Sequence, residues 1–295
     1  MKKLCSFLLG LSFVLTTGAV AAAQDKPGEM HAPPPVLYIN REFIKPGKGG
    51  AVHERTESAF VKAMSGANSK QHYLALNSLS GKSRALFLSG YASFGDWETQ
   101  VMTDMKNSTL SAALDHAAMA DGELLDAYDQ SVWIYREDQS MNQTGNLVGI
   151  RYMQLEVFSV KPGHEEDWNV AVKMVKEAYA KGMPDAHWAM YQNVFGRETP
   201  AFLVITPMKS VSQIDRDFAN GSKFTDAMGV DGMKKLNELS AAAIASTETN
   251  LFVISPKMSY MGEDLAKDDP EFWHSKPEPA AESKKEKSEA KPKTP

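Results

Sequence analysis

The chain has 295 residues, of which 23% are charged and 43% are hydrophobic. This composition is typical of globular proteins and excludes a disordered or fibrous chain as a whole. Lysine and arginine number 32 against 37 aspartates and glutamates, a formal net charge of -5. That balance argues against a nucleic-acid partner. At roughly 150 residues per domain, the length predicts about two domains.

The N-terminus has the pattern of a secretory signal peptide. Lys2 and Lys3 precede an uncharged apolar run, and the small residues at 21–23 come before Gln24. This pattern predicts a signal peptide at residues 1–23, with an uncleaved anchor as the alternative. Cys5 is the single cysteine, so a mature chain would hold no disulfide and no thiolate ligand. We therefore expect an exported protein, periplasmic or secreted, without a transmembrane segment in its mature form.

Several motifs occur twice in the same order. Lys45-Pro46-Gly47 returns as Lys161-Pro162-Gly163, Gly81 returns as Gly196, and Val132–Tyr135 returns as Leu251–Ile254. The spacing between the paired motifs changes by only a few residues. A collinear pattern of this kind indicates two copies of one unit. The copies are expected at residues 36–140 and 147–260, after a flexible segment at 24–35.

Each copy predicts the order strand, helix, strand, strand, helix, strand. Strands are indicated by β-branched and aromatic runs that end at Lys-Pro-Gly or at other turn residues. In the first copy the expected elements are a strand Val36–Ile44, a helix Gly50–Met64, a hairpin Gln71–Leu79 and Arg84–Ala92, a helical region Trp97–Tyr128 and a strand Ser131–Tyr135.

The second copy repeats these elements with a clearer first helix. Trp168, Val172, Val175 and Tyr179 lie at helical spacing and form one apolar face. The expected elements are a strand Arg151–Val160, a helix His164–Lys181, a hairpin Ala186–Phe195 and Ala201–Met208, a helical region Ile214–Ile244 and a strand Asn250–Ile254.

The composition changes at Gly262. The segment from there to Pro295 is rich in acidic residues, lysine and proline, and Phe272 and Trp273 are its only large aromatic residues. Such a segment buries too little apolar surface to offset the entropy lost on ordering. We therefore predict a disordered tail at residues 262–295.

The repeated βαββαβ order with Lys-Pro-Gly after the first strand resembles the dimeric α/β-barrel superfamily, over about residues 36–256. Within it, the pattern is most similar to the antibiotic-biosynthesis-monooxygenase-like and NIPSNAP-like families. The resemblance implies an α+β fold in which two tandem ferredoxin-like units form an intramolecular barrel. The physics agrees, because a sheet with helices on one face needs a cover for the other. The superfamily hosts unrelated activities, so the resemblance implies no single function.

A polar and aromatic stripe is predicted on one face of the strands. Alternation puts Tyr38, Asn40 and Glu42 on one side of the first strand, and Gln154 and Glu156 on one side of its repeat. If this face lines the space between the sheets, it can hold a small, partly aromatic ligand. The alternative is a solvated or internally hydrogen-bonded strand face. The ligand-binding candidates are Tyr38, Tyr73, Asn77, Gln154, Glu156, Trp188 and Gln192.

A second set of candidates comes from the resemblance alone. In haem-degrading and quinone-forming members of the monooxygenase-like family, an Asn, a Trp and a His form the site, which here implies Asn40, Trp97 and His116. The gap from Trp97 to His116 is longer than the family pattern and needs a loop near Asn107. The second copy has no matching His. Haem is the cofactor that this reading implies, and no metal-ligand spacing motif is present in the sequence.

Three functions remain open from the sequence. The first is non-catalytic binding of a small ligand between the sheets, or a stress or envelope role through protein contacts. The second is a monooxygenase-like enzyme that uses Asn40, Trp97 and His116 on haem or a reduced aromatic. The third is a protein-interaction module with an unknown partner, which predicts an exposed apolar patch.

Overall fold

The computed structural model describes residues 32–143, 145–198 and 200–274. The predicted signal peptide and most of the segment at 24–35 lie outside these ranges. The first half of the chain contains β1 (Val36–Ile44), α1 (Ala51–Gly66), β2 (Leu74–Ser78), β3 (Arg84–Tyr91), α2 (Phe94–Lys106), α3 (Ser108–Gly122) and β4 (Leu125–Tyr135). A 3-10 turn, η1 (Glu137–Gln139), follows it.

The second half contains β5 (Tyr152–Val160), α4 (Glu165–Gly182), β6 (Ala189–Phe195), β7 (Ala201–Met208), α5 (Ser212–Ala219), α6 (Gly221–Ala243) and β8 (Ile244–Ile254). Two short helices, α7 (Glu263–Ala266) and α8 (Pro270–Trp273), come last. Among the helices of the described ranges, none has both the length and the apolar character of a membrane span.

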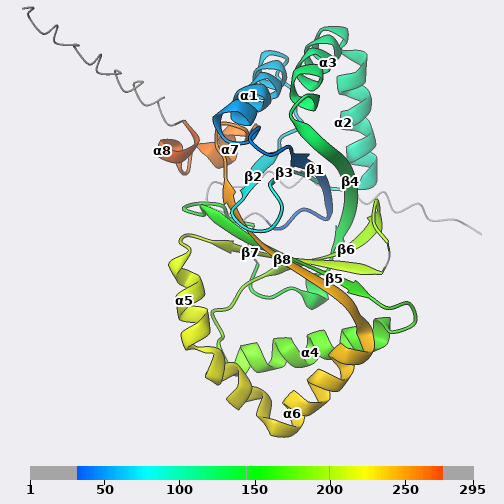
Figure 1. Ribbon diagram of the computed structural model, residues 1–295, viewed down its shortest axis with the longest axis vertical. Helices are drawn as coiled ribbons and strands as arrows, with labels where there is room; N and C mark the ends of the chain where they lie inside the picture. The colour runs from blue at the N-terminus through cyan, green and yellow to red at the C-terminus, as the bar shows by residue number, and fades with distance from the viewer. Residues whose placement is uncertain (1–31, 144, 199, 275–295) are drawn as a thin grey trace, which may run out of the picture. The chain divides into compact units, whose positions relative to one another are not determined.

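The eight strands close into one barrel in the order β1-β3-β2-β8-β5-β7-β6-β4. Helices α1, α2 and α3 lie on one side of the strands and α4, α5 and α6 on the other (Figure 1). The two halves meet where β2 pairs with β8 and where β4 pairs with β6. The fold is therefore α+β with a sheet-rich core.

The barrel interior is filled with side chains. Leu37 and Ile39 on β1, together with Met153 and Leu155 on β5, point into it. Apart from a small cavity of about 40 Å³ near Trp133, this core leaves little room for a ligand. The expectation that a ligand lies between the sheets is therefore wrong. Strand alternation turns the predicted polar stripe outward, toward the helices.

Two strands are longer than predicted. β4 begins at Leu125, inside a stretch that the sequence predicts as helical, and β8 begins at Ile244, ahead of the predicted strand Asn250–Ile254. These early residues pair with the ends of β1 and β5, for example Ala127 with Phe43 and Thr247 with Phe158. In β4, pairing with a neighbouring strand thus decides the conformation of residues that the sequence predicts as helical.

The first part of the tail is ordered, which corrects the prediction of disorder from residue 262. Asp269 receives hydrogen bonds from the Arg151 guanidinium at 2.7 and 3.1 Å, and from the Gly149 amide at 3.0 Å. Phe272 and Trp273 pack against the core of the barrel. Two aromatic side chains and one ion pair are enough to fix this segment. Residues 275–295 lie outside the described ranges.

Candidate functional site

A large cavity lies in the second half, between the outward face of the strands and the helices. Its volume is about 960 Å³, and its lining comes from β5, β6 and β7 and from α4, α5 and α6. This volume is in the upper range of small-molecule sites. The helices of the second half thus leave an opening above the sheet.

Aromatic side chains form much of the cavity wall. The Tyr179 ring lies 5.2 Å from that of Trp188 and 5.0 Å from that of Phe224, measured between centroids. Trp168, which is buried as predicted, stacks on Phe202 at 4.8 Å. Aromatic contacts of this kind suit a flat, apolar ligand.

The floor of the cavity carries polar groups from the strands. Gln154 and Glu156 on β5 and Thr206 on β7 are part of the lining. The Thr249 hydroxyl donates to Glu156 Oε1 at 2.9 Å. Burial raises the pKa of Glu156, and the Thr249 hydrogen bond offsets this only in part. The floor therefore favours a ligand group that can donate a hydrogen bond or carry a positive charge.

The rim of the cavity lies on α5. The Phe218 side chain is 82% exposed although it contributes to the lining. Next to it, burial raises the pKa of Asp217, against the opposing effects of Arg216 and His187. One His187 ring nitrogen, Nε2, lies 2.9 Å from the Pro207 carbonyl oxygen. A ligand in the cavity would cover the Phe218 ring.

The predicted ligand-binding residues fall into two groups. Gln154, Glu156 and Trp188 line the cavity together. Gln192 is not part of this lining, and its Oε1 accepts a hydrogen bond from Arg136 at 2.6 Å. The others belong to the first half, where Tyr38 packs on Trp97 with ring centroids 5.5 Å apart.

Tyr73 and Asn77 also have neighbours in the first half. The Tyr73 ring meets Phe87 edge-on at 5.9 Å, and burial raises the pKa of the Tyr73 hydroxyl. The Asn77 side-chain amide donates to the Met258 sulfur at 3.4 Å.

The residues suggested by the resemblance have separate contacts. Asn40 Oδ1 accepts a hydrogen bond from the Tyr128 hydroxyl at 3.0 Å. Trp97 packs against Tyr38, Tyr91 and Phe94. His116 is exposed on α3. The loop expected near Asn107 is present, since α2 ends before this residue and its side chain caps α3 by accepting from the Leu110 amide.

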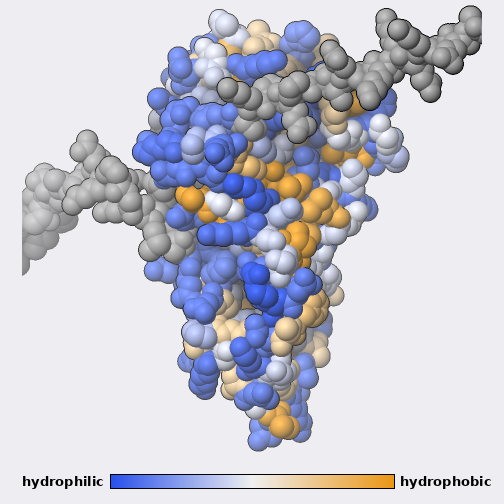
Figure 2. Space-filling model, turned by 90° about the vertical axis from the view of Figure 1, so that its left-hand side faces the viewer, coloured by the Kyte–Doolittle hydropathy of each residue, from blue (hydrophilic) through white to orange (hydrophobic). Residues whose placement is uncertain are grey.

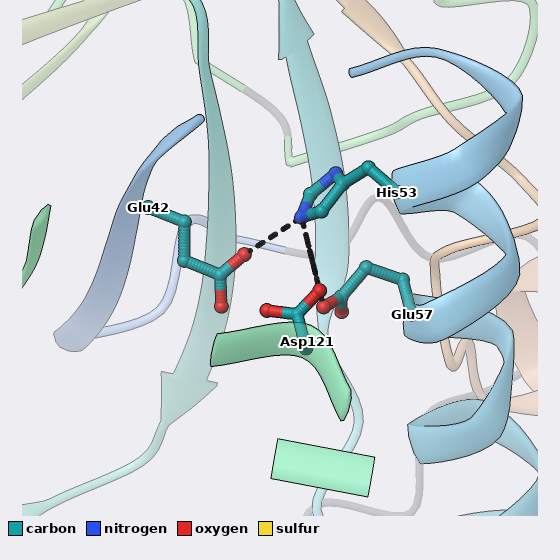
Figure 3. A group of neighbouring side chains, drawn as sticks. All are labelled: Glu42, His53, Glu57 and Asp121. Atoms are coloured by element: carbon teal, nitrogen blue, oxygen red, sulfur yellow. Dashed lines mark hydrogen bonds and ion pairs between the residues drawn. The ribbon is translucent and has the colours of Figure 1, made fainter. Parts of the chain in front are cut away.

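Sequence reading missed a buried polar group in the first half. Glu42 on β1, His53 and Glu57 on α1, and Asp121 on α3 point toward one another (Figure 3). The available signal was the helical i, i+4 spacing of His53 and Glu57. This spacing alone is a weak metal-ligand signal without a second histidine, and Asp121 comes from a distant helix.

No protein-family model and no curated protein matches this sequence. Some solved structures are similar to it in outline. One is an anthrone oxidase-like protein, with 11% identity, a TM-score of 0.47, and coverage of 75% of this chain and 91% of the other. Another is a chlorite dismutase from Candidatus Nitrospira defluvii, with 12% identity, a TM-score of 0.45, and coverage of 80% and 95%. At these scores we take no activity from either.

Proposed function

We propose that the protein binds a small, partly aromatic ligand in the cavity of the second half, without converting it. The observation that carries this proposal is the combination of aromatic walls and a polar floor in one cavity of about 960 Å³. Pockets that bind small molecules have this composition, with few polar groups among many apolar ones.

The lining also suggests how the ligand lies. Its ring would pack on Trp188 and Tyr179, and its polar group would face Glu156 and Gln154. Because the partly buried Glu156 carboxyl offers acceptor oxygens to the cavity, a neutral donor or an amine suits this floor better than a carboxylate. The proposal therefore favours neutral and cationic aromatics over anionic ones.

A fluorescent probe tests the proposal. N-phenyl-1-naphthylamine is neutral and aromatic, and its emission should rise on saturable binding to the wild-type protein. We expect Trp188→Ala to weaken binding at least tenfold. Trp97→Ala, which alters an aromatic contact in the first half, is the matched control and should bind as the wild type does.

Competition then defines the ligand class. Aromatic amines should displace the probe at lower concentration than aromatic acids of the same size, and Glu156→Gln should reduce this preference. Haemin should be tested in the same competition assay, with the wild-type protein and His116→Ala compared. Haem is the cofactor implied by the enzyme alternative, in which His116 takes part. Probe binding that is equally weak in wild type and in Trp188→Ala would rule out the cavity as the site.

A protein-interaction role is the second candidate function, because apolar side chains are exposed on the helices that line the cavity. Val230 on α6 is 88% exposed. Figure 2 shows apolar side chains at the lower tip of the molecule, at the height of α6 in Figure 1. Sedimentation at rising protein concentration would detect self-association through this tip. Val230→Lys should abolish it, and identical monomeric behaviour of both proteins would exclude it.

We further propose that the protein is exported and that its halves are two ferredoxin-like units. The sequence of residues 1–23 supports export. The strand orders β4-β1-β3-β2 and β8-β5-β7-β6 support two equivalent units. Mass spectrometry of protein from the cell envelope fraction should find an N-terminus at Gln24, whereas an intact Met1 would exclude cleavage.

A further inference from the structure

The buried polar group of the first half consists of one imidazole and three carboxyl groups. Glu42, His53, Glu57 and Asp121 are 8%, 1%, 3% and 2% exposed. They come from a strand and two helices and meet beneath α1 (Figure 3). Even with His53 protonated, three ionised carboxylates would leave a net negative charge with almost no access to water. Burying such a charge is costly unless a cation accompanies it.

The second half shows that the fold does not need this group. The strand pairing shifts its register just before Ile44 in β1 and just before Val160 in β5. Glu42 and Phe158 each stand two residues before the end of that shift, so they occupy equivalent positions. Phe158 packs with Trp168 and with Val172 of the first helix in its half. The same place between strand and helix is therefore lined by apolar side chains there. Packing alone gives no reason for the polar group in the first half.

The donor atoms have the spacing of ligands around one small ion. His53 Nε2 lies 3.1 Å from Glu42 Oε2, 3.5 Å from Asp121 Oδ1 and 3.8 Å from Glu57 Oε1. All four donors lie within 4.8 Å of one another. Two ligands held about 2.1 Å from a shared ion are roughly 3 to 4 Å apart. Only small shifts would bring these atoms into coordination.

Two further observations point to a missing partner. Glu57 Oε1 is buried and has no hydrogen-bond partner among the described residues. Thr56 is a supporting neighbour, because its hydroxyl lies 2.6 Å from Asp121 Oδ1 and fixes that carboxyl. Outer groups that orient metal ligands are a regular part of metal sites.

We propose that Glu42, His53, Glu57 and Asp121 form a binding site for one divalent transition-metal ion, of the Mn²⁺ or Fe²⁺ class. Three oxygen donors suit Mn²⁺, and one imidazole favours a transition ion over Ca²⁺ or Mg²⁺. Ca²⁺ also takes six to eight oxygen ligands at longer distances, which four close donors do not provide.

Electron paramagnetic resonance with Mn²⁺ tests this directly. The signal of free Mn²⁺ should disappear up to one equivalent when the ion is added to chelator-treated protein. Zn²⁺ should release the bound Mn²⁺, and Ca²⁺ in large excess should not. Glu57→Gln keeps the side-chain shape and should weaken Mn²⁺ binding at least tenfold. His164→Ala is the matched control, because His164 is a partly exposed histidine paired with Asp167 on the other half, and it should bind as the wild type does.

Thermal unfolding gives a second readout that does not depend on a variant. Mn²⁺ should raise the melting temperature of the wild-type protein, and the rise should grow with the logarithm of the Mn²⁺ concentration above the Kd, because only the folded state holds the four ligands together. The proposal fails if the wild-type protein takes up no equivalent of Mn²⁺ or Zn²⁺. It also fails if Glu57→Gln binds the ion as tightly as the wild type does.

Discussion

Matching positions in the two halves have opposite chemistry at the scale of single residues. Glu42 and Phe158 both project outward from the first strand of their half. Glu42 faces the His53 imidazole, whereas Phe158 lies 5.0 Å from the Trp168 ring, between centroids. A position in the backbone therefore does not determine whether the space above it is polar or apolar. The side chains on the covering helix decide that.

Trp168 should be a major contributor to the stability of the second half. Its side chain is 4% exposed and stacks on Phe202. We expect Trp168→Ala to lower the free energy of unfolding by about 3 to 5 kcal/mol, as for other buried aromatic truncations. Urea unfolding measures this loss. Trp97→Ala removes a half-buried indole and should cost less stability. Equal losses in the two variants would contradict the role of Trp168 as a major core residue.

Short segments contribute at the scale of elements. Helices α7 and α8 have only four residues each, which is too short for either to be stable alone. α7 is anchored by the buried Ala266, and α8 is held by contacts with the barrel, since the Arg151 guanidinium lies over the Phe272 ring at 3.8 Å and also binds Asp269. Tertiary contacts therefore create these helices.

Removing this docked segment should destabilise the protein. We expect deletion of residues 262–295 to lower the melting temperature by more than about 5 °C, because Phe272 and Trp273 leave the core. Deletion of residues 275–295 is the control and should change it by much less. Equal effects of both deletions would show that docking at Phe272 and Trp273 contributes nothing.

The ion pair of this segment predicts a dependence on pH. The hydrogen bond from Arg151 lowers the pKa of Asp269 below its usual value, which is about 4. The stabilisation is therefore present above about pH 4 and is lost as the pH falls through the lower pKa of the folded state. At pH 7, Asp269→Asn should cost about 1 to 3 kcal/mol. This difference from the wild type should shrink toward pH 2 in urea unfolding, and a constant difference would argue against the ion pair.

The two hairpin turns hold the halves together at the scale of the whole molecule. Gly81, between β2 and β3, has a φ of 73° and lies against Asn250 of β8. Gly196, between β6 and β7, has a φ of 84° and lies against the Gln130 backbone of β4. Each turn thus contacts the last strand of the opposite half. This contact explains why the sequence repeats a glycine at both places.

The two glycines should differ in their tolerance of a side chain. A Cβ at position 196 would lie 2.0 Å from the Gln130 carbonyl oxygen, whereas at position 81 it would meet the movable Asn250 side chain at 2.2 Å. We expect Gly196→Ala to cost roughly 2 kcal/mol or more and Gly81→Ala less. Chemical unfolding of both variants measures this order, and the reverse order would contradict the close contact between Gly196 and the Gln130 backbone.

Unfolding of the protein should be a single event. The interior core contains residues of both halves. Among them are Leu76 from β2 and Ile254 from β8, which pair where the two halves meet. We expect tryptophan fluorescence and far-ultraviolet circular dichroism to report the same midpoint in urea. Two separate transitions would show that the halves are stable independently.

Much of this architecture could be predicted from local patterns. The limits of β1 and β7, the apolar face of α4 and the repeated turns all follow from residue periodicity and from Lys-Pro-Gly. The early parts of β4 and β8 could not be predicted, because partners distant in the sequence decide them. Neither could the order at Phe272 and Trp273, which depends on one arginine more than a hundred residues away.

The candidate sites were less accessible from the sequence than the fold. Strand alternation places Gln154, Glu156 and Trp188 on one face of the sheet. Whether this face points into the barrel or outward depends on how the eight strands close into the barrel. The group around His53 combines elements that lie up to about 80 residues apart, and no spacing rule joins Glu42 to Asp121. Its residues become a group only in three dimensions.

Closing the barrel within one polypeptide has a consequence for how such a protein can evolve. In a barrel built from two identical subunits, every substitution appears in both halves at once, so a mutation that improves one outer face must also be tolerated on the other. Covalent linkage of the halves removes this constraint. One face can then accumulate acidic residues around a histidine while the other acquires an aromatic cavity, and neither change is copied across. A single gene thereby carries two independently selectable surfaces on one scaffold.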